Sequence, residues 1–304
     1  MIKFVEEKQL KNLEFGREDF YLCLASSSEE LLEQNWFAIG EKFPWRLKKS
    51  GISRFESHVG LDYITLVIPD LSSVQHKKGG RQVHIFFTGR LLVFLCKKKS
   101  REYRIVESFR KIDRNDGTLG KFLCMFFDRL MEKDEFTLDH LEQQIGKIEE
   151  DLITSKRSDC VKEIVQLRNR LLYLKRYYEQ MYHILDCIQE NENSLLDRSM
   201  LRYIKMAKNR ADRLLQTVIS LRDYVSQVRE AYQAQVDINL NNVMKIFTVI
   251  TTIFSPLALI AGWYGMNLQM PEYTWAWGYP AVILLSISVV VICLWLFKKH
   301  RWFS

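Results

Sequence analysis

Residues 241–297 read NNVMKIFTVITTIFSPLALIAGWYGMNLQMPEYTWAWGYPAVILLSISVVVICLWLF, and this stretch decides how the chain folds. It holds two apolar runs, Ile246–Trp263 and Ala281–Phe297, and Glu272 is the only formally charged residue between Ile246 and Phe297. Because a helix rises about 1.5 Å per residue, about 20 residues cross a hydrocarbon core of roughly 30 Å. A single run could be a buried core helix, but two uncharged runs in tandem predict a hairpin that crosses a membrane twice.

The charges beside the two runs predict the orientation of this hairpin. The loop between the runs contains no Lys or Arg, whereas Lys245 precedes the first run and Lys298, Lys299 and Arg301 follow the second. Positively charged flanks stay on the cytoplasmic side, so we expect a multi-pass protein of the cell (plasma or inner) membrane with both termini in the cytoplasm. Aromatic residues at the outer end predict interfacial anchoring; they are Trp263, Tyr264, Tyr273, Trp275, Trp277 and Tyr279.

Several short motifs in and around the hairpin resemble those of the CorA-type (Gly-Met-Asn motif) divalent metal ion transporters. The tripeptide Gly265-Met266-Asn267 closes the first run, which is the position that makes it specific to that family. The other matching motifs are Asn242-Val243-Met244-Lys245, Ser255-Pro256, Ala261–Tyr264, Met270-Pro271-Glu272, Trp277-Gly278-Tyr279-Pro280 and the basic tail. Upstream of residue 241 the resemblance rests on architecture rather than on motifs.

The expected fold class is an α+β membrane protein with an N-terminal α/β cytoplasmic domain, a long helical stalk and a C-terminal two-helix transmembrane hairpin. The expected parts are the α/β domain (1–117), antiparallel cytoplasmic helices (118–194), the stalk helix (195–245), the first transmembrane helix (246–263), the extracytoplasmic loop (264–280), the second transmembrane helix (281–297) and the basic tail (298–304).

Residues 1–117 contain short apolar or alternating runs separated by turn signals, which predict strands mixed with helices and hence a covered sheet. The predicted strands are Phe20–Ala25, Tyr63–Pro69, Val83–Phe87 and Leu91–Lys97; Ser28–Ala38 is a predicted helix, and 76–80 and 88–90 are predicted turns. Asp62 and Asp70 flank a strand and are candidate metal ligands, although a solvated or turn-capping role is the commoner one for such residues.

From Thr118 onward the sequence favours helices, because no Pro occurs before Pro256. We predict one helix over Leu119–Thr154, a turn over 155–159, a second helix over Cys160–Glu190, and a third that starts near Leu195 and runs into the first span. In the third helix, apolar residues with 4-3 spacing predict a coiled-coil seam, or alternatively packing against the first two helices of the same chain. They are Ala207, Ala211, Leu214, Val218, Leu221, Val225, Val228 and Tyr232.

The same 3-4 spacing continues into the membrane span, where it selects polar and small residues instead. This stripe consists of Asn241, Met244, Thr248, Thr251, Ser255, Ala258 and Gly262. Hydroxyl and amide groups that face lipid are unfavourable, so several copies of the helix could arrange these side chains around a water-filled path. Alternatively, the Thr and Ser hydroxyls bond the carbonyls four residues before them and only pack tightly.

The resemblance implies a homopentamer in which the first span of each subunit lines the pore and Gly265, Met266 and Asn267 form a ring at the outer mouth. An Asn267 ring would accept hydrogen bonds from the water shell of Mg²⁺, which is a small, hard ion that dehydrates reluctantly. Asn241 offers a second amide ring near the cytoplasmic end. Glu272 is expected to concentrate cations at the outer mouth, and Lys298, Lys299 and Arg301 to form a basic collar at the inner one.

Three positions depart from the pattern of the family. Ser255 stands where Met or Leu is common, and Ala258 where Thr is common, so the apolar gate is expected elsewhere, for example at Met244 and Phe247. Met206, between Lys205 and Lys208, stands where many relatives carry a stalk carboxylate that senses Mg²⁺. Closure by a metal ion at that position is therefore doubtful for this chain.

The expected function is a homopentameric channel or transporter that moves Mg²⁺ into the cytoplasm, with itself, the lipid bilayer and divalent cations as partners. A Zn²⁺, Co²⁺ or Ni²⁺ transporter on the same fold is an alternative, although Met266 favours Mg²⁺; a membrane-anchored scaffold or sensor is another. No catalytic activity or resident cofactor is expected, because no nucleophile, base or metal-ligand motif can be assembled from the soluble part. No nucleic-acid partner is expected, because the net charge of +7 is spread along helices and the tail. The six cysteines are expected to be reduced, and no signal peptide is expected.

Overall fold

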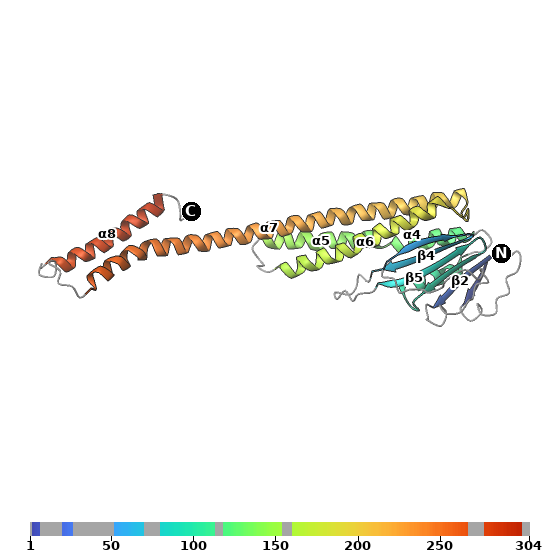
Figure 1. The fold of residues 1–304 in the computed structure, drawn as a ribbon, viewed down its shortest axis with the longest axis horizontal. Coiled ribbons are helices and arrows are strands. Elements are labelled where there is room, and N and C mark those ends of the chain that lie inside the picture. The colour runs from blue at the N-terminus through green and yellow to red at the C-terminus, as the bar shows by residue number, and fades with distance from the viewer. Residues whose placement is uncertain are drawn as a thin grey trace. The chain divides into compact units, whose positions relative to one another are not determined.

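The computed structural model describes residues 2–6, 20–26, 52–69, 80–112, 118–153, 160–266 and 277–299. The chain divides into two compact units, Met1–Arg229 and Glu230–Ser304, and each is described by itself (Figure 1). The predicted helix Ser28–Ala38, the candidate ligand Asp70 and most of the predicted turns at 76–80 and 155–159 lie outside the described residues.

The first unit contains a six-stranded mixed sheet with the order β1-β2-β6-β5-β4-β3. Strands β1, β2 and β6 pair in parallel, whereas β6, β5, β4 and β3 pair antiparallel. The strands are β1 (Ile2–Glu6), β2 (Phe20–Ser26), β3 (Arg54–His58), β4 (Leu61–Ile68), β5 (Arg81–Thr88) and β6 (Leu91–Cys96).

Both faces of the central strands are covered, because β6 is buried at every position and β4 at all but one. A strand that is half-exposed would alternate between buried and exposed positions. Helices α3 (Arg101–Ser108), α4 (Leu119–Met131) and α6 (Val161–Glu190) contact the sheet (Figure 1). This mixed sheet with its helices confirms the predicted α+β class.

The predicted strands overlap β2, β4, β5 and β6, and the predicted turn at 88–90 joins β5 to β6. The hydroxyl of Thr88 accepts a hydrogen bond from the Leu91 backbone N–H at 3.0 Å in that turn. Strands β1 and β3, helix α3 and the short 3-10 helix η1 (Phe109–Lys111) were not predicted. Strands β1 and β3 lie at the two edges of the sheet, where a strand needs no continuous apolar run.

The prediction of one unbroken helix over Leu119–Thr154 was wrong, because the chain forms two helices there, α4 and α5 (Asp134–Ile153). Arg101 provides the physical reason: its guanidinium donates to the carbonyl of Leu130 at 2.8 Å and contacts the Asp134 carboxylate at 3.6 Å. These contacts cap the last turn of α4 and hold the first residue of α5. An isolated helix pattern does not reveal an Arg that arrives from another element.

Helix α7 (Arg198–Tyr264) begins in the first unit and continues through the second. Its predicted seam is buried within the single chain from Ala207 to Val228, where exposures range from 0 to 7 %, whereas Tyr232, the last predicted member, is half-buried. Lys208 pairs with Asp186 of α6 at 2.9 Å, and Tyr224 donates to Glu149 of α5 at 2.5 Å. Packing against helices of the same chain, rather than a seam between copies, is therefore what the structure contains here (Figure 1).

The second unit consists of the C-terminal part of α7 followed by α8 (Gly278–Lys299). Helix α8 begins three residues before the predicted run and ends two residues after it, with Lys298 and Lys299 in its last turn. Cations at a helix C-terminus interact favourably with the helix dipole. Lys299 also lies over the ring of Trp295, 5.0 Å from its centroid.

Candidate ion pathway

Two helices of the second unit are long and apolar enough to cross a membrane, α7 and α8. None of the apolar window of α7 is buried within the chain, and only 6 % of that of α8 is. A core helix of a soluble domain would be mostly buried. Large side chains are exposed on both helices, for example Phe254 at 63 % and Leu284 at 71 %. Such a surface requires lipid or another protein surface to cover it.

The predicted polar stripe lies on the described, exposed surface of α7. Asn241, Met244, Thr248, Thr251, Ser255, Ala258 and Gly262 are all exposed. The two residues predicted to form an apolar gate, Met244 and Phe247, are 62 % and 61 % exposed. Among the residues that the structure describes, no side chain therefore covers this face of the helix.

One of the three hydroxyl groups in the stripe bonds to its own helix. Thr248 donates to the carbonyl of Met244 at 2.8 Å, as the alternative reading of the stripe required. Thr251 and Ser255, which the structure also describes, make no comparable bond. Their hydroxyls can therefore still donate and accept hydrogen bonds, with water or with another copy of the helix.

Pro256 lies inside α7 and leaves a gap in the hydrogen-bond ladder of the helix. Because proline has no N–H, the carbonyl of Thr252 loses the partner that it would have four residues later. The thiol of Cys293 in α8 lies 4.0 Å from that carbonyl oxygen and is directed as a weak donor. The sequence gives no sign of this contact, because Cys293 reaches the Thr252 carbonyl only when the hairpin forms.

Helix α7 ends next to the predicted Gly-Met-Asn ring. The first residue after the helix, Gly265, leaves no space for a side chain. The N–H of Gly265 donates to the Ala261 carbonyl at 2.9 Å. A Cβ atom at Gly265 would lie 2.9 Å from that same carbonyl oxygen, which is closer than real contacts allow. Met266 is 48 % exposed, and Asn267 and Glu272 lie outside the described residues.

The predicted basic collar is described in part. Lys298 and Lys299 are exposed at the end of α8, and Arg301 lies outside the described residues. Both lysines thus project charge at the end of the helix that the sequence assigns to the cytoplasm.

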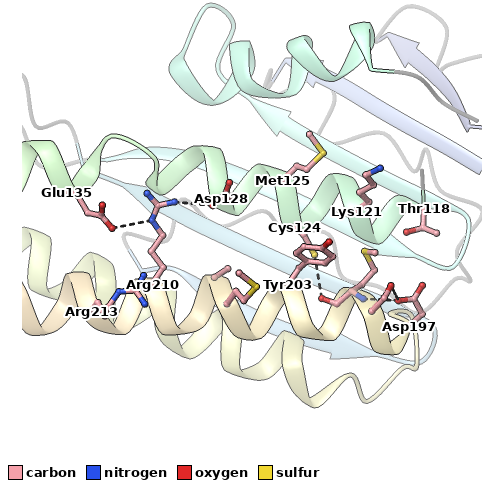
Figure 2. A pocket seen from close by; sticks show the side chains of 14 residues that line it. Thr118, Lys121, Cys124, Met125, Asp128, Glu135, Asp197, Tyr203, Arg210 and Arg213 are labelled. Atoms are coloured by element: carbon pink, nitrogen blue, oxygen red, sulfur yellow. Dashed lines mark hydrogen bonds and ion pairs between the residues drawn. The ribbon is translucent and has the colours of Figure 1, made fainter. Parts of the chain in front are cut away.

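Met206, at the position of the expected stalk carboxylate, is 62 % exposed and lines a cavity of about 830 Å³. The cavity lies between α4 and α7, where Arg210 reaches Asp128 at 3.0 Å and Glu135 at 3.6 Å (Figure 2). Two of the three acids that line this cavity, Asp128 and Glu135, are therefore paired with an arginine. Burial raises the pKa of the neighbouring Cys124 thiol to about 12, so it remains protonated.

Steps of seven from Asn241 toward the N-terminus reach Ala234, Gln227, Ser220, Arg213 and Met206, and all of them are exposed. The stripe therefore has the same heptad position as an exposed series that extends into the first unit. The buried seam from Ala207 to Val228 occupies other positions of the heptad. In the first unit the seam of α7 packs against its own chain, whereas the stripe residues of α7 in the second unit are exposed.

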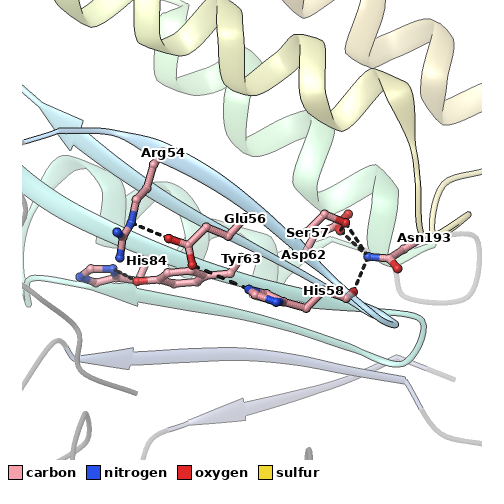
Figure 3. A network of polar contacts seen from close by, with 8 residues as sticks. All are labelled: Arg54, Glu56, Ser57, His58, Asp62, Tyr63, His84 and Asn193. Atoms are coloured by element: carbon pink, nitrogen blue, oxygen red, sulfur yellow. Dashed lines mark hydrogen bonds and ion pairs between the residues drawn. The ribbon is translucent and has the colours of Figure 1, made fainter. Parts of the chain in front are cut away.

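Asp62, the described member of the two candidate metal ligands, has a turn-stabilising role. Its carboxylate accepts from the Ser57 hydroxyl at 3.2 Å and from the Asn193 side-chain amide at 2.7 Å (Figure 3). Within the described ranges, no group of three or more His, Cys, Asp or Glu is close enough to hold a metal ion. The six cysteines form no disulfide.

Comparison with known proteins identifies relatives over most of the chain. Residues 46–299 match the family described as CorA-like Mg2+ transporter protein. The cobalt/magnesium transport protein CorA of Thermotoga maritima is 28 % identical over 254 residues, which are 82 % of this chain and 71 % of that protein. The magnesium transport protein CorA of Wolinella succinogenes is 40 % identical over 79 residues, 26 % of this chain and 25 % of that protein.

Solved structures share the fold at low sequence identity. The complete structure of the CorA magnesium transporter from Methanocaldococcus jannaschii has a TM-score of 0.70 and 18 % identity, over 83 % of this chain and 80 % of that chain. The full-length CmaX protein has a TM-score of 0.74 and 17 % identity, over 97 % of this chain and 93 % of that chain.

Proposed function

The chain belongs to the CorA-like Mg2+ transporter family, and from this membership we propose that it forms a homopentameric channel that conducts hydrated Mg²⁺ into the cytoplasm. The family is one of transporters rather than of enzymes. Within the proposal, residues 246–263 and 281–297 are the two membrane spans, and the first span of each subunit lines the pore.

The observation that carries the proposal is the exposed polar stripe on an apolar helix. From Asn241 to Gly262 every residue of the stripe is exposed in the single chain, and the hydroxyls of Thr251 and Ser255 are unused within the described part of the helix. One hairpin cannot enclose a pore, so the stripe has a use only when several copies surround a common axis. In the pentamer the stripes would meet water instead of lipid, which removes the cost of placing polar groups in hydrocarbon.

Selection at the outer mouth follows from the chemistry of the ion. Mg²⁺ binds oxygen ligands and gives up its water reluctantly. In the proposed ring, the amide oxygens of Asn267 and backbone carbonyls at Gly265 and Met266 accept hydrogen bonds from coordinated water, so the ion need not be stripped. A ring of carboxylates would bind a divalent ion more firmly and release it more slowly. Asn241 supplies a second amide ring nearer the cytoplasm.

The remaining charged residues have supporting roles in the proposal. Glu272 raises the concentration of cations at the outer mouth. Lys298, Lys299 and Arg301 form a collar at the inner end that favours the cytoplasmic orientation of both termini. Met244 and Phe247 form the apolar constriction, since the Ser255 side chain is polar and the Ala258 side chain is too small to narrow a pore.

The test is transport by the purified protein in liposomes that contain a Mg²⁺-sensitive dye. Asn267→Ala removes the proposed ring of amides, and we expect Mg²⁺ entry to fall at least about tenfold. Asn239→Ala is the matched control, because Asn239 is exposed on α7 outside the stripe. Both variants must insert and retain the native mass of the wild type. Wild-type entry through Asn267→Ala would refute the ring.

The name of the Thermotoga relative gives a specific reason to consider Co²⁺ as a second cargo. Co²⁺ also forms an octahedral hydrate, so a pore that recognises coordinated water would accept it. The same liposomes separate the two ions by competition: external Co²⁺ should slow Mg²⁺ entry through the wild type. A cargo of Co²⁺ alone predicts no Mg²⁺ entry at any concentration.

A further inference from the structure

The connection between α6 and α7 is a rigid segment in the first unit. Asn191 adopts a left-handed conformation with φ of 51°, and its side-chain amide exchanges two hydrogen bonds with the backbone of Leu196, at 2.9 and 3.0 Å. Asp197 then caps α7, since its carboxylate accepts from the Met200 N–H at 2.8 Å and from the Ser199 hydroxyl at 2.7 Å. The backbone between Asn191 and the first turn of α7 is therefore held at both ends.

Asn193, in the middle of this connection, binds the turn between β3 and β4 with its whole amide group (Figure 3). Its nitrogen donates to the His58 carbonyl at 2.7 Å, to the Asp62 carboxylate at 2.7 Å and to the Ser57 hydroxyl at 3.0 Å. Its oxygen accepts from the Gly60 backbone N–H at 2.9 Å. Two N–H groups serve three acceptors, so at least one of these bonds is shared.

The chemistry at this contact favours an amide. Asp62 is only 6 % exposed, and its buried carboxylate requires donors. Gly60 has a positive φ of 75° and presents its N–H outward, where it requires an acceptor. An amide supplies both a donor and an acceptor, whereas an aspartate of the same shape would place a second carboxylate against Asp62.

We propose that Asn193 is the positioning residue that transmits the position of the sheet to the pore-lining helix α7. This inference rests on the proposed function, because it assigns α7 to the pore. A displacement of the β3–β4 turn moves Asn193 through four hydrogen bonds, and the stiff backbone from Asn191 to Asp197 passes that movement to the start of α7. Asn193 acts through α7 and contacts no ion itself.

The start of α7 also packs against α4, so the test must separate the two attachments. The carbonyl of Met200 lies 3.8 Å from the Cys124 sulfur, and a Cβ at Gly120 would lie 2.6 Å from Leu196 Cδ2. These contacts would remain after substitution of Asn193. They hold the helix against its neighbour, whereas Asn193 holds it to the sheet.

The first measurement is hydrogen exchange of the full-length protein in detergent. In Asn193→Ala, we expect the amides of Gly60 and of the first turn of α7 (198–201) to exchange about tenfold faster than in the wild type, while α8 is unchanged. Asn169→Ala, at an exposed position of α6, is the matched control and should leave all of these rates unaltered. Unchanged rates at Gly60 and 198–201 in Asn193→Ala would overturn the proposal.

A reciprocal exchange of the two groups separates positioning from a general loss of packing. Asn193→Asp alone opposes two carboxylates, and we expect it to accelerate exchange at least as much as Asn193→Ala does. The double variant Asn193→Asp/Asp62→Asn restores an amide donor and a carboxylate acceptor between positions 193 and 62 but leaves the His58 carbonyl without its donor. Its exchange rates should therefore return part of the way toward the wild type. Equal defects in the single and double variants would contradict the assigned contact.

Transport in liposomes then gives the functional readout. We expect Asn193→Ala to lower the maximal Mg²⁺ flux about threefold or more with KM within about twofold of the wild type, because the outer mouth is untouched. The double variant should recover part of the flux. Wild-type flux in Asn193→Ala refutes the coupling and leaves the proposed function standing, whereas absence of flux in the wild type refutes the proposed function and, with it, the role of Asn193 in a pore.

Discussion

His84 is a buried histidine that the proposed transport does not use. Its ring lies on β5 with 4 % exposure, and Nδ1 lies 2.9 Å from the Tyr63 hydroxyl and 3.4 Å from that of Thr65. Burial, with a smaller contribution from the positive charge of Arg54, lowers its pKa from 6.5 to about 4. The folded protein therefore holds the neutral imidazole, and protonation must favour the unfolded chain.

The sign of this shift predicts how stability depends on pH. A pKa that is lower in the folded state contributes stability above pH 6.5 that is lost as the pH falls toward 4. Between pH 7.5 and pH 5 we expect His84 to lower the free energy of unfolding by about 2 kcal/mol. Urea unfolding of the wild type and of His84→Gln at both pH values measures the difference, since glutamine does not titrate.

Subtracting the pH dependence of stability in His84→Gln from that in the wild type removes the effect of other groups that titrate in the same range. Burial raises the pKa of Asp62 and of Asp134, so their contributions change in the opposite direction on acidification. An equal pH dependence in the wild type and in His84→Gln would show that His84 is not the group responsible.

Some residue contacts could be predicted from the sequence, and others could not. A solvated or turn-capping role was the favoured interpretation of Asp62. The structure shows a buried carboxylate that stabilises the turn through Ser57 and Asn193. The role of Asn193 could not be predicted from the sequence, because its partners lie 131 to 136 positions away in the chain. The contact of Cys293 could not be predicted for the same reason, since its partner is a carbonyl that Pro256 leaves free.

At the scale of elements, periodicity in the sequence located the long helices but did not identify their neighbours. The 4-3 pattern from Ala207 to Val228 correctly indicated one continuous buried stripe, yet such a pattern is the same whether the partner is another copy or another helix of the chain. The break between α4 and α5 was missed because Arg101 creates it from outside the helix. The edge strands β1 and β3 were missed because they are short.

The packing of the seam within the chain gives a prediction about stability. Val218 is fully buried, whereas its neighbour Thr217 is exposed and donates to the Arg213 carbonyl at 3.0 Å. Val218→Ala should lower the free energy of unfolding by about 2 kcal/mol, from lost transfer free energy and the cavity left behind. Thr217→Ala should change it by less than about 0.5 kcal/mol. Urea unfolding in detergent measures both.

Measuring this loss of stability at several protein concentrations shows whether the seam packs within one chain or between copies. If Val218 packs within the chain, the loss in Val218→Ala is the same at every protein concentration. If it packs between copies, the variant should dissociate on dilution, and its apparent stability should vary with concentration. The second outcome would contradict the packing described for α7.

At the scale of the whole molecule, the two units have different surfaces. In the first unit apolar side chains are buried in the sheet and in the seam of α7, whereas the second unit exposes them along both helices, as Leu259 of α7 and Leu284 of α8, each at 71 %, illustrate. A helix pair of this kind is stable only in lipid or among copies of itself. The polar stripe favours copies of the helix pair over lipid on its own face, because its hydroxyl groups can then face water around a common axis.

A hydrated pore without a coupled ion predicts that the membrane potential alone drives accumulation. Each elementary charge gains about 2.3 kcal/mol across 100 mV, so a divalent cation gains about 4.6 kcal/mol on entry. The ratio of internal to external Mg²⁺ should therefore rise about tenfold for every 30 mV, roughly, of inside-negative potential. Liposomes with potassium diffusion potentials set by valinomycin measure this ratio, and protein-free liposomes give the leak. The slope of this ratio against potential gives the charge that moves with each ion. A slope that corresponds to two charges indicates passive entry of Mg²⁺. A slope of zero would require an electroneutral carrier, which has no use for a continuous polar stripe through the span.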